Sequence, residues 1–564
     1  MIYFLDGYSD EEYTEKTKFK KTNGRAGSPL NSLDPDTEFM VNEAKYRKDN
    51  FSTNRVTGTR DSRSISEPLR NEDDFFPKET TSVRFQLNRS ESSSVDNYTL
   101  SRFESKILNG TGIIFSGGPV WAMSWVPQPS FKPTQYLAVS THHDHKETLY
   151  SSELIEPGFI QLWRVVIDPD QNISEDPKLI LGIAHSYGKI WDLEWCPSGR
   201  WEESISLGDL AAACSDGTVR IFEVRFPKKG RKFVRLSASK SLFPSEQSQG
   251  HCLSVSWYRG PKHRYIAGSF VSGLVCVWDL ESESSLTKTL KGTLPILSWT
   301  AHASTVNGIS LASSSTEFPE YCATGGSDRS YRFWDLRDTC SPIQEVKRGL
   351  VTRVDWIPGL HAAAVCHDDV YLQAHTQTLI SETGVTKNAS QPVIGQNSCI
   401  WDQSVSPWLG ALAVCSSAGE LVIYMMPDRN KSVDQNRSSG KRRAYVYMTK
   451  NITEDDKSET GSNDKDDISK FNLSFIDLLD SLNASSNEKE LKRKVRYSEK
   501  MCEENLLNYP ICSLNRVEWN MNLGSHLLLA SGGQSGLVRI HSLTFLNTDK
   551  LQSTMNASTS NSEF

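Results

Sequence analysis

The amino-acid sequence predicts an all-β protein, a seven-bladed β-propeller, and three observations lead to this prediction. A pattern of four short strands returns along the chain, with an apolar strand ending in Trp, an Ala- and Cys-rich strand, and an alternating strand that often closes on Trp-Asp. The pattern occurs seven times. The length of 564 residues exceeds one ordinary compact domain, but a repeat architecture can hold it in a single ring.

The seven copies follow one another from about residue 119 to residue 543. Each copy is recognised by its best-matching segments, which are VWAMSWVP with GFIQLWRV, IWDLEWCPSG with LAAACSDGTVRIFEV, LSVSWYRGPKHRYIAGSF with SGLVCVWDL, VNGISLA with YCATGGSDRSYRFWDLRD, TRVDWIPGLHAAAVCHDDVYLQAH, IWDQSVSPWLGALAVCSSAGELVIYMM, and NRVEWNMNLGSHLLLASGGQSGLVRIHSL. Each copy is the length of one four-stranded blade, so seven blades are expected.

Polar residues at fixed places in the copies are expected to hold the turns rather than to catalyse. An Asp in the turn between the second and third strands accepts backbone and imidazole hydrogen bonds and so fixes the register of the hairpin. His302, Asp328 and Trp334 have the order of the WD-repeat hydrogen-bond network, in which His bridges the turn Asp and the strand Trp. The residues assigned to this structural role are Asp216, Trp278, Asp279, His302, Asp328, Trp334 and Asp335.

A seven-bladed ring must also close, because an open ring exposes two sheet edges. The run Gly112-Ile113-Ile114-Phe115 precedes the first copy and has the pattern of a strand. We expect it to supply the outer strand of the last blade.

Segments outside the repeats are polar. Residues 1–103 have too few apolar residues to bury a core and are predicted to be a disordered extension, with the propeller over 104–545 and a disordered tail over 546–564. Within the extension, Phe75 and Phe76 lie in the acidic run DDFFP. This run is either a docking peptide for another subunit or a chance cluster in a disordered tail.

Two insertions interrupt the ring. A loop near 225–235 is strongly basic, and a second insertion over 428–504 has basic ends and an acidic middle. The second insertion also contains FNLSFIDLLDSL, whose apolar residues at helical spacing predict a short amphipathic helix that a partner could bind. Candidate contacts to DNA or a partner are Lys228, Lys229, Arg231, Lys232, Arg235, Lys441, Arg442 and Arg443, and candidate partner-peptide residues are Phe75, Phe76, Phe471, Phe475, Leu478 and Leu479.

Composition narrows the class of function. The formal net charge of −7 is not that of a protein that grips nucleic acid unaided, so DNA contact is expected to be local or to come through partners. The first residues are acidic where a signal peptide needs a basic start, no run approaches a membrane span, and the eleven cysteines never form a CxxC pair. We expect an intracellular protein with reduced thiols, no membrane contact, no cofactor and no small-molecule substrate.

Motifs that could indicate a metal site or a phosphate-binding loop are weak. The His142-His143-Asp144-His145 run offers metal-ligand side chains, but neighbouring residues point in different directions, which favours a solvated loop. Gly532, Gly533 and Gly536 fall where a blade hairpin turns, and no Lys follows to meet a phosphate. The sequence therefore predicts a binding protein and not an enzyme.

The blade sequences also contain segments that are not common to WD repeats in general. GPVWAMSWVP, GIAHSYGKIWDLEWCPSGRWE, LGDLAAACSDGTVRIF, GGSDRSYRFWDLRD and SGGQSGLVRIH, spread in order over about residues 117–541, resemble the WD-repeat second polypeptide of general transcription factor IIIC. The resemblance implies a nuclear, non-catalytic scaffold subunit that supports promoter recognition and initiation by RNA polymerase III at transfer RNA and other small RNA genes. The implied partners are a second WD-repeat subunit and the large DNA-binding subunit, with DNA reached mainly through the complex.

An alternative comes from a different class. Trp334-Asp335-Leu336-Arg337 fits the WDxR pattern by which many propellers bind the linker of a cullin-type ubiquitin ligase, which makes a substrate receptor the second hypothesis. A helical segment before the propeller would favour this reading, and the polar N-terminal stretch does not indicate one. Affinity purification separates the two hypotheses.

Overall fold

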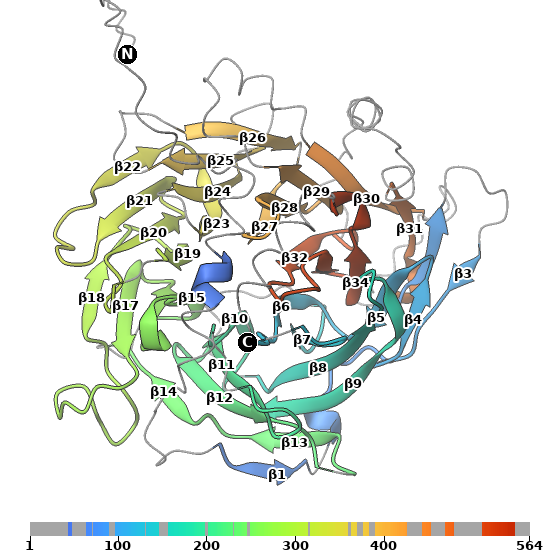
Figure 1. Cartoon of the computed structure of the whole chain (residues 1–564), viewed down its shortest axis with the longest axis horizontal. Coiled ribbons are helices and arrows are strands. Elements are labelled where there is room, and N and C mark those ends of the chain that lie inside the picture. The colour runs from blue at the N-terminus through green and yellow to red at the C-terminus, as the bar shows by residue number, and fades with distance from the viewer. Residues whose placement is uncertain are drawn as a thin grey trace, which may run out of the picture. The chain divides into compact units, whose positions relative to one another are not determined.

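Strand pairing joins the seven predicted copies into seven sheets that follow one another around a ring (Figure 1). In this computed structural model the innermost strand of each blade packs beside the innermost strand of the next, and the seventh packs beside the first. The structure describes residues 43–47, 64–69, 72–88, 96–129, 131–145, 156–197, 201–228, 230–244, 249–313, 316–358, 362–368, 376–382, 390–396, 398–425, 443–452, 468–478 and 510–547. All of them belong to the unit Pro35–Phe564.

Each blade contains a sheet of four antiparallel strands, as the repeat pattern predicts. From the innermost strand outward, blade 1 has β6 (Val120–Trp125), β7 (Thr134–Thr141), β8 (Gly158–Ile167) and β9 (Ile173–His185); blade 2 has β10 (Ile190–Trp195), β11 (Ser206–Cys214), β12 (Val219–Arg225) and β14 (Lys240–Leu242); blade 3 has β15 (Cys252–Trp257), β16 (Tyr265–Phe270), β17 (Leu274–Asp279) and β18 (Leu297–Thr300); and blade 4 has β19 (Val306–Leu311), β20 (Tyr321–Gly326), β21 (Ser330–Asp335) and β22 (Gln344–Lys347).

The remaining three blades repeat this order. Blade 5 has β23 (Leu350–Trp356), β24 (Ala362–Asp368), β25 (Thr376–Glu382) and β26 (Ser390–Gln396); blade 6 has β27 (Ile400–Ser406), β28 (Ala411–Ser416), β29 (Glu420–Met425) and β30 (Arg443–Asn451); and blade 7 has β32 (Leu514–Trp519), β33 (Leu528–Gly533), β34 (Leu537–Ser542) and β5 (Thr111–Phe115). Short 3-10 turns are η1 (Glu72–Asp74), η2 (Pro261–His263), η4 (Ile468–Lys470) and η5 (Thr544–Leu546).

The N-terminal side of the chain closes the ring. Strand β5 pairs antiparallel with β34, so a strand from before the first copy completes the last blade. All five residues of β5 are buried. The predicted closure by Gly112–Phe115 is thus confirmed, because a strand from before the first blade joins the last one.

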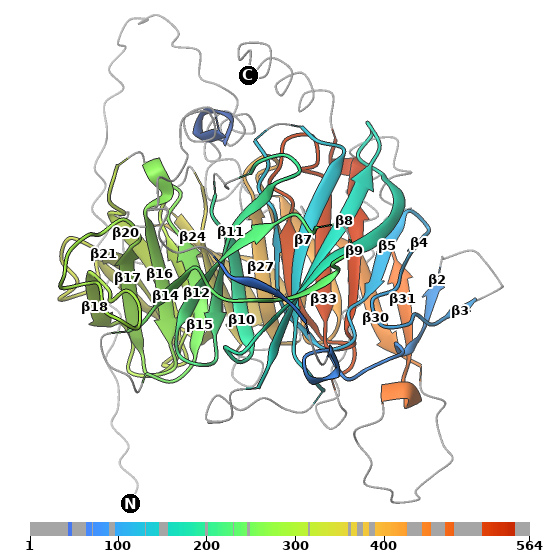
Figure 2. The same ribbon diagram turned by 90° about the horizontal axis from the view of Figure 1, so that it is seen from below.

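Additional strands widen three blades at their outer edges. Strand β13 (Phe233–Leu236) pairs parallel with β9, and β1 (Ser66–Pro68) then pairs with β13, on the outside of blade 1. On blade 6, β31 (Asn472–Asp477) pairs with β30, and β2 (Arg84–Asn88) and β3 (Asn97–Tyr98) follow outward. On blade 7, β4 (Ser105–Leu108) pairs with β5. Figure 2 shows β2, β3 and β4 along the outer wall of the ring.

These strands correct three expectations. The described parts of residues 1–103 pack on the propeller instead of remaining disordered, because a few residues such as Phe76 and Phe85 bury their rings against it. Part of the insertion predicted over 428–504 is the outer strand β30 of blade 6. The helix predicted in FNLSFIDLLDSL is strand β31 over its described part, because β30 offers it an edge to pair with and Leu473 and Phe475 enter the core.

The apolar core lies between neighbouring blades. Small residues such as Ala211 and Ala213 on β11 pack against Trp257 on β15, so the sheets approach closely. Cys252 and Cys276 are buried in this layer, and Cys214 is buried in the core between blades 1 and 2. Burial raises the pKa of Cys214 and Cys252 well above the ordinary thiol value. Among the described residues, no helix has the length and apolarity that crossing a bilayer requires.

Candidate interaction sites and the central channel

The turn of blade 4 contains a four-residue hydrogen-bond network. His302 Nδ1 lies 2.9 Å from Asp328 Oδ1, and His302 Nε2 lies 2.8 Å from Thr324 Oγ1. Trp334 Nε1 donates to the same Thr324 oxygen at 2.9 Å. The predicted order of His, Asp and Trp is confirmed, but the link from His to Trp runs through the Thr324 hydroxyl, which was not predicted from the sequence.

The other residues assigned to turns also have structural contacts. Asp216 accepts hydrogen bonds from the backbone N–H and the hydroxyl of Thr218 and pairs with Arg220 at 2.7 Å. Trp278 Nε1 donates to the Phe243 carbonyl at 3.0 Å, and Asp279 forms a two-point ion pair with Arg264. Asp335 pairs with the exposed Arg337 at 2.7 Å.

The predicted basic loop is partly a strand. After β12 the chain leaves blade 2, forms β13 on the outer edge of blade 1, and returns to blade 2 as β14. Lys228, Arg231, Lys232 and Arg235 are all exposed on this crossing, while Val234 faces the core. Lys229 lies outside the described residues. The structure thus brings four of the five predicted basic residues to one stretch of the outer wall.

The aromatic pair in DDFFP binds its own chain. Phe76 is buried, and its ring lies 5.2 Å from the ring of Phe159 and 4.7 Å from that of Phe233. The partly buried Phe75 packs against the same cluster and lies under the Arg235 guanidinium, at 5.8 Å. The expectation that this run is a peptide for another subunit is therefore wrong for Phe76, because the groove it fills is on blade 1.

Apolar residues of the second insertion are also buried against blades of the same chain. Phe475 on β31 is buried against Phe85 of β2, with ring centroids 5.9 Å apart. Phe471 and Leu478 are partly buried against the cores on either side of blade 6. Arg443 begins strand β30, whereas Lys441, Arg442 and Leu479 lie outside the described residues.

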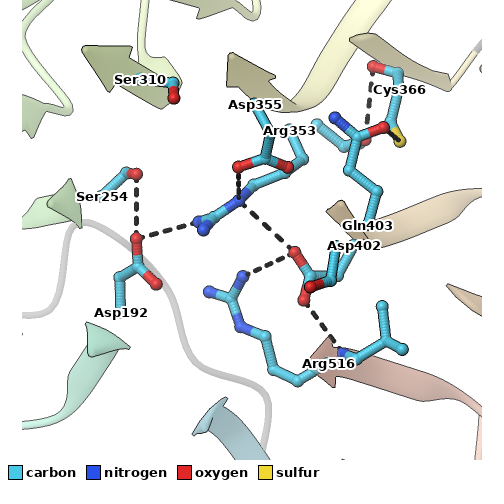
Figure 3. A network of polar contacts seen from close by, with 12 residues as sticks. Asp192, Ser254, Ser310, Arg353, Asp355, Cys366, Asp402, Gln403 and Arg516 are labelled. Carbon is cyan, nitrogen blue, oxygen red and sulfur yellow. Dashed lines mark hydrogen bonds and ion pairs between the residues drawn. The ribbon is translucent and has the colours of Figure 1, made fainter. Parts of the chain in front are cut away.

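Charged side chains of the innermost strands meet in the centre of the ring (Figure 3). Arg353 of β23 pairs with Asp192 of β10 at 2.9 Å and lies 3.4 Å from Asp402 of β27. Arg516 of β32 pairs with the same Asp402 at 3.2 Å. The network therefore connects blades 2, 5, 6 and 7 across the channel. Asp355 adds a fifth charge, 3.5 Å from Arg353.

Polar side chains also join the innermost strands of neighbouring blades at four of the boundaries that the structure describes. Glu194 accepts the Trp257 N–H at 2.6 Å, Ser256 the Leu311 N–H at 3.0 Å, Ser310 the Trp356 N–H at 2.9 Å, and Ser404 the Trp519 N–H at 3.1 Å. We call these four hydrogen bonds the inter-blade zipper. Its sequence signal is a polar residue at one place in each copy, directly before Trp in IWDLEW and LSVSWY. The zipper was not predicted from that signal.

Burial sets the charge state of the channel. It raises the pKa of Glu194 to about 8 and that of Asp355 to about 6, and it raises the pKa of Glu518 well above its ordinary value. Burial alone would also raise the pKa of Asp192, but the Arg353 and Arg516 guanidiniums hold it below its ordinary value. At neutral pH the ionised Asp192 is thus matched by arginines, and Glu194 keeps its proton.

The His142–His145 run is built into blade 1. The His142 ring is buried, stacked at 5.6 Å on Trp121 and edge-on to Trp191, and burial lowers its pKa to about 3. Lys78 pairs with Asp144 at 3.0 Å. In the part of the chain that the structure describes, no group of three potential ligands is placed to hold a metal ion. Gly536 has a φ of 74° and occupies a hairpin turn of blade 7.

A closed ring of seven four-stranded blades, with a His-Thr-Trp-Asp network in a blade turn, defines the chain as a WD-repeat β-propeller. The model of the WD domain, G-beta repeat, matches residues 178–223 and 293–335. These residues include β10, β11 and most of β12 of blade 2, and most of blade 4.

The chain is similar to two proteins named general transcription factor 3C polypeptide 2, from Pongo abelii and Homo sapiens. Each is 28% identical over 528 residues, which is 83% of this chain and 57% of the relative. Transcription factor tau subunit sfc6 of Schizosaccharomyces pombe is 25% identical over 439 residues, 77% of this chain and 65% of the relative. The resemblance predicted from the blade sequences is confirmed, and the chain spans less than two thirds of the length of these relatives.

Proposed function

We propose that this chain is the WD-repeat subunit of a transcription factor IIIC and has a general transcription role at genes read by RNA polymerase III. The observation that carries the proposal is the similarity to general transcription factor 3C polypeptide 2 over 83% of the chain. Its work is binding rather than catalysis. In this role the chain is a nuclear protein, and its partners are a second WD-repeat subunit and the large DNA-binding subunit.

The ring suits a scaffold. The arginine network and the inter-blade zipper hold the innermost strands together, so the outer wall and both faces are presented by a rigid frame. The carboxylates of Asp192, Glu194 and Asp402 are engaged by arginines or by backbone N–H groups, an arrangement that stabilises the ring. A rigid frame binds partners without the entropy loss of ordering flexible surfaces.

DNA is reached mainly through the complex. The basic segment from Lys228 to Arg235, on the outer edge of blade 1, adds a local contact. Lys228, Arg231, Lys232 and Arg235 are exposed together, and lysines and arginines that approach phosphates release counterions. Reversing Lys228 and Arg231 to Glu in the assembled complex is expected to lower the slope of log affinity against log salt by about 0.9 for each phosphate that the variant no longer neutralises. Reversal of the exposed Lys288 and Lys291 on blade 3 is the matched control, which should leave the slope unchanged.

Affinity purification of the tagged chain from nuclear extract tests the proposal. Recovery of the other transcription factor IIIC subunits in near-equal amounts is the expected result, with mass spectrometry as the readout. Recovery of a cullin and its linker without polymerase III factors would instead establish the ligase alternative. An Arg337→Ala variant distinguishes the two further, because it weakens linker binding only if the WDxR pattern is used.

A further inference from the structure

One helical turn, residues 43–47, lies over the end of the channel (Figures 1 and 2, dark blue). Its Arg47 is buried, with 5% of the residue exposed. Arg47 Nη1 donates to the Gln128 carbonyl at 3.2 Å, Nη2 donates to the Met521 carbonyl, and the guanidinium lies 5.5 Å from the Trp408 ring. These three groups come from the connections that follow β6, β32 and β27, so one arginine contacts blades 1, 7 and 6.

The other side of the turn contacts blade 3. Glu43 is buried with 3% exposed, and it accepts a hydrogen bond from Arg259 Nη2 at 2.7 Å. The Arg259 guanidinium lies 4.5 Å from the Tyr46 ring, which meets the His263 ring edge-on. Glu43 also accepts from Arg47 Nε at 3.0 Å. Glu43 therefore bridges one guanidinium of its own turn and one of the ring.

The carbonyls and the indole on the ring side of this contact are held by other residues of the ring. The Met521 carbonyl already accepts the Trp408 Nε1 hydrogen at 2.8 Å, and the backbone around Gln128 is fixed by Asn522, which accepts the Gln128 N–H at 2.8 Å. Arg259 and Met521 also line the channel cavity, whose volume is about 150 Å³. The mouth thus presents two carbonyls and an indole face in fixed positions, with the Arg259 guanidinium beside them.

This set is complementary to an acid and an arginine four residues apart on one helix face. Carbonyl oxygens and an indole face suit a guanidinium, and Arg259 suits a carboxylate. Residues four apart on a helix lie side by side, which places both groups toward the mouth together. Lys45, between them, is exposed.

We propose that the channel mouth is a peptide-binding site for a helical turn with Glu and Arg at positions i and i+4, and that residues 43–47 are its ligand within the same chain. The bound turn ties blades 1, 3, 6 and 7 together and covers the cavity. A partner segment of the same chemistry gains the site only when residues 43–47 leave it. This proposal does not depend on the assignment to transcription factor IIIC.

A labelled peptide spanning residues 38–52 tests the site by fluorescence anisotropy on the full chain. The double variant Glu43→Ala/Arg47→Ala empties the site and is expected to bind the peptide saturably, about tenfold or more tighter than the native chain, whose site is filled. A peptide with Arg47→Ala should lose about tenfold or more in affinity, because it removes charge-assisted hydrogen bonds. A peptide with Lys45→Ala is the matched control and should bind as the native peptide does.

Absence of saturable binding to the double variant, or equal binding of the Arg47→Ala peptide, would overturn the proposal. Hydrogen exchange provides a second measurement that needs no added peptide. In a full-length Arg259→Gln chain, which retains the native turn, the amides of residues 43–47 should exchange faster than in the native chain while those of β15 remain protected. Unchanged exchange at residues 43–47 would also contradict the site.

Discussion

Removal of the Asp477 carboxylate should weaken the outer contact between blades 6 and 7 and so lower the stability of the fold. Arg539 of β34 is buried with 1% exposed, and its Nη2 donates to both Asp477 oxygens, at 2.8 and 2.9 Å. Its guanidinium lies against two rings, 4.2 Å from the centroid of Tyr447 and 4.5 Å from that of Phe475. Asp477→Ala leaves this cation buried without its counterion.

The expected cost follows from that burial. Removing one partner of a buried ion pair destabilises a protein by about 3–5 kcal/mol, because the remaining charge stays desolvated. Replacing both members, as in Asp477→Leu/Arg539→Met, should recover most of this loss, since an apolar pair of similar volume needs no counterion. The unfolding free energy from urea denaturation, followed by tryptophan fluorescence, measures both.

The matched control is the exposed pair of Glu317 and Lys262. Glu317→Ala removes the same chemical group where water screens the charges, so the urea midpoint should not move measurably. A loss of less than about 1 kcal/mol for Asp477→Ala would refute the reasoning. Equal losses for the double and single variants would refute it as well.

Three further predictions concern the blade turn, the channel and the N-terminal extension. Thr324→Val should destabilise the fold by about 1–3 kcal/mol in urea, because it leaves His302 Nε2 and Trp334 Nε1 without their buried hydrogen-bond partner. Thr324→Ser should restore the loss, and equal urea midpoints for the two variants would contradict the network. Burial raises the pKa of Glu194 to about 8, so its protonated form adds stability that is complete below the pKa of the unfolded chain and is lost progressively as pH rises to about 8. Glu194→Gln should therefore flatten the fall in melting temperature between about pH 5 and 8, and an unchanged slope would exclude Glu194 as its source. Phe76→Ala removes a buried ring worth about 3–5 kcal/mol of local packing and should release residues 72–88 to faster hydrogen exchange, whereas native protection there would show that Phe76 is not the anchor.

The ring could be predicted because its signals are local. Each copy brings its own apolar pattern and turn residues, and Gly112–Phe115 could be assigned to the last blade because a ring needs closure. The His302, Asp328 and Trp334 network could be predicted in the same way, except for Thr324. A threonine in a strand has many ordinary reasons to be there, so its bridging role depends on the folded geometry.

The outer strands and the channel could not be predicted in the same way. Residues 1–103 are polar on average, and the average conceals single anchors such as Phe76 and Phe85, whose burial depends on grooves formed by distant blades. In FNLSFIDLLDSL the apolar spacing fits a helix as well as a strand, and the free edge of β30 decides between them. Asp192 and Arg353 meet only because the ring closes, although they are 161 residues apart.

Chromatin occupancy of the tagged chain tests the central claim most directly. If the chain is a transcription factor IIIC subunit that reaches DNA through the complex, its signal should concentrate at transfer RNA genes and disappear when the large DNA-binding subunit is depleted. A signal without enrichment at these genes, or one that persists after that depletion, would contradict the account.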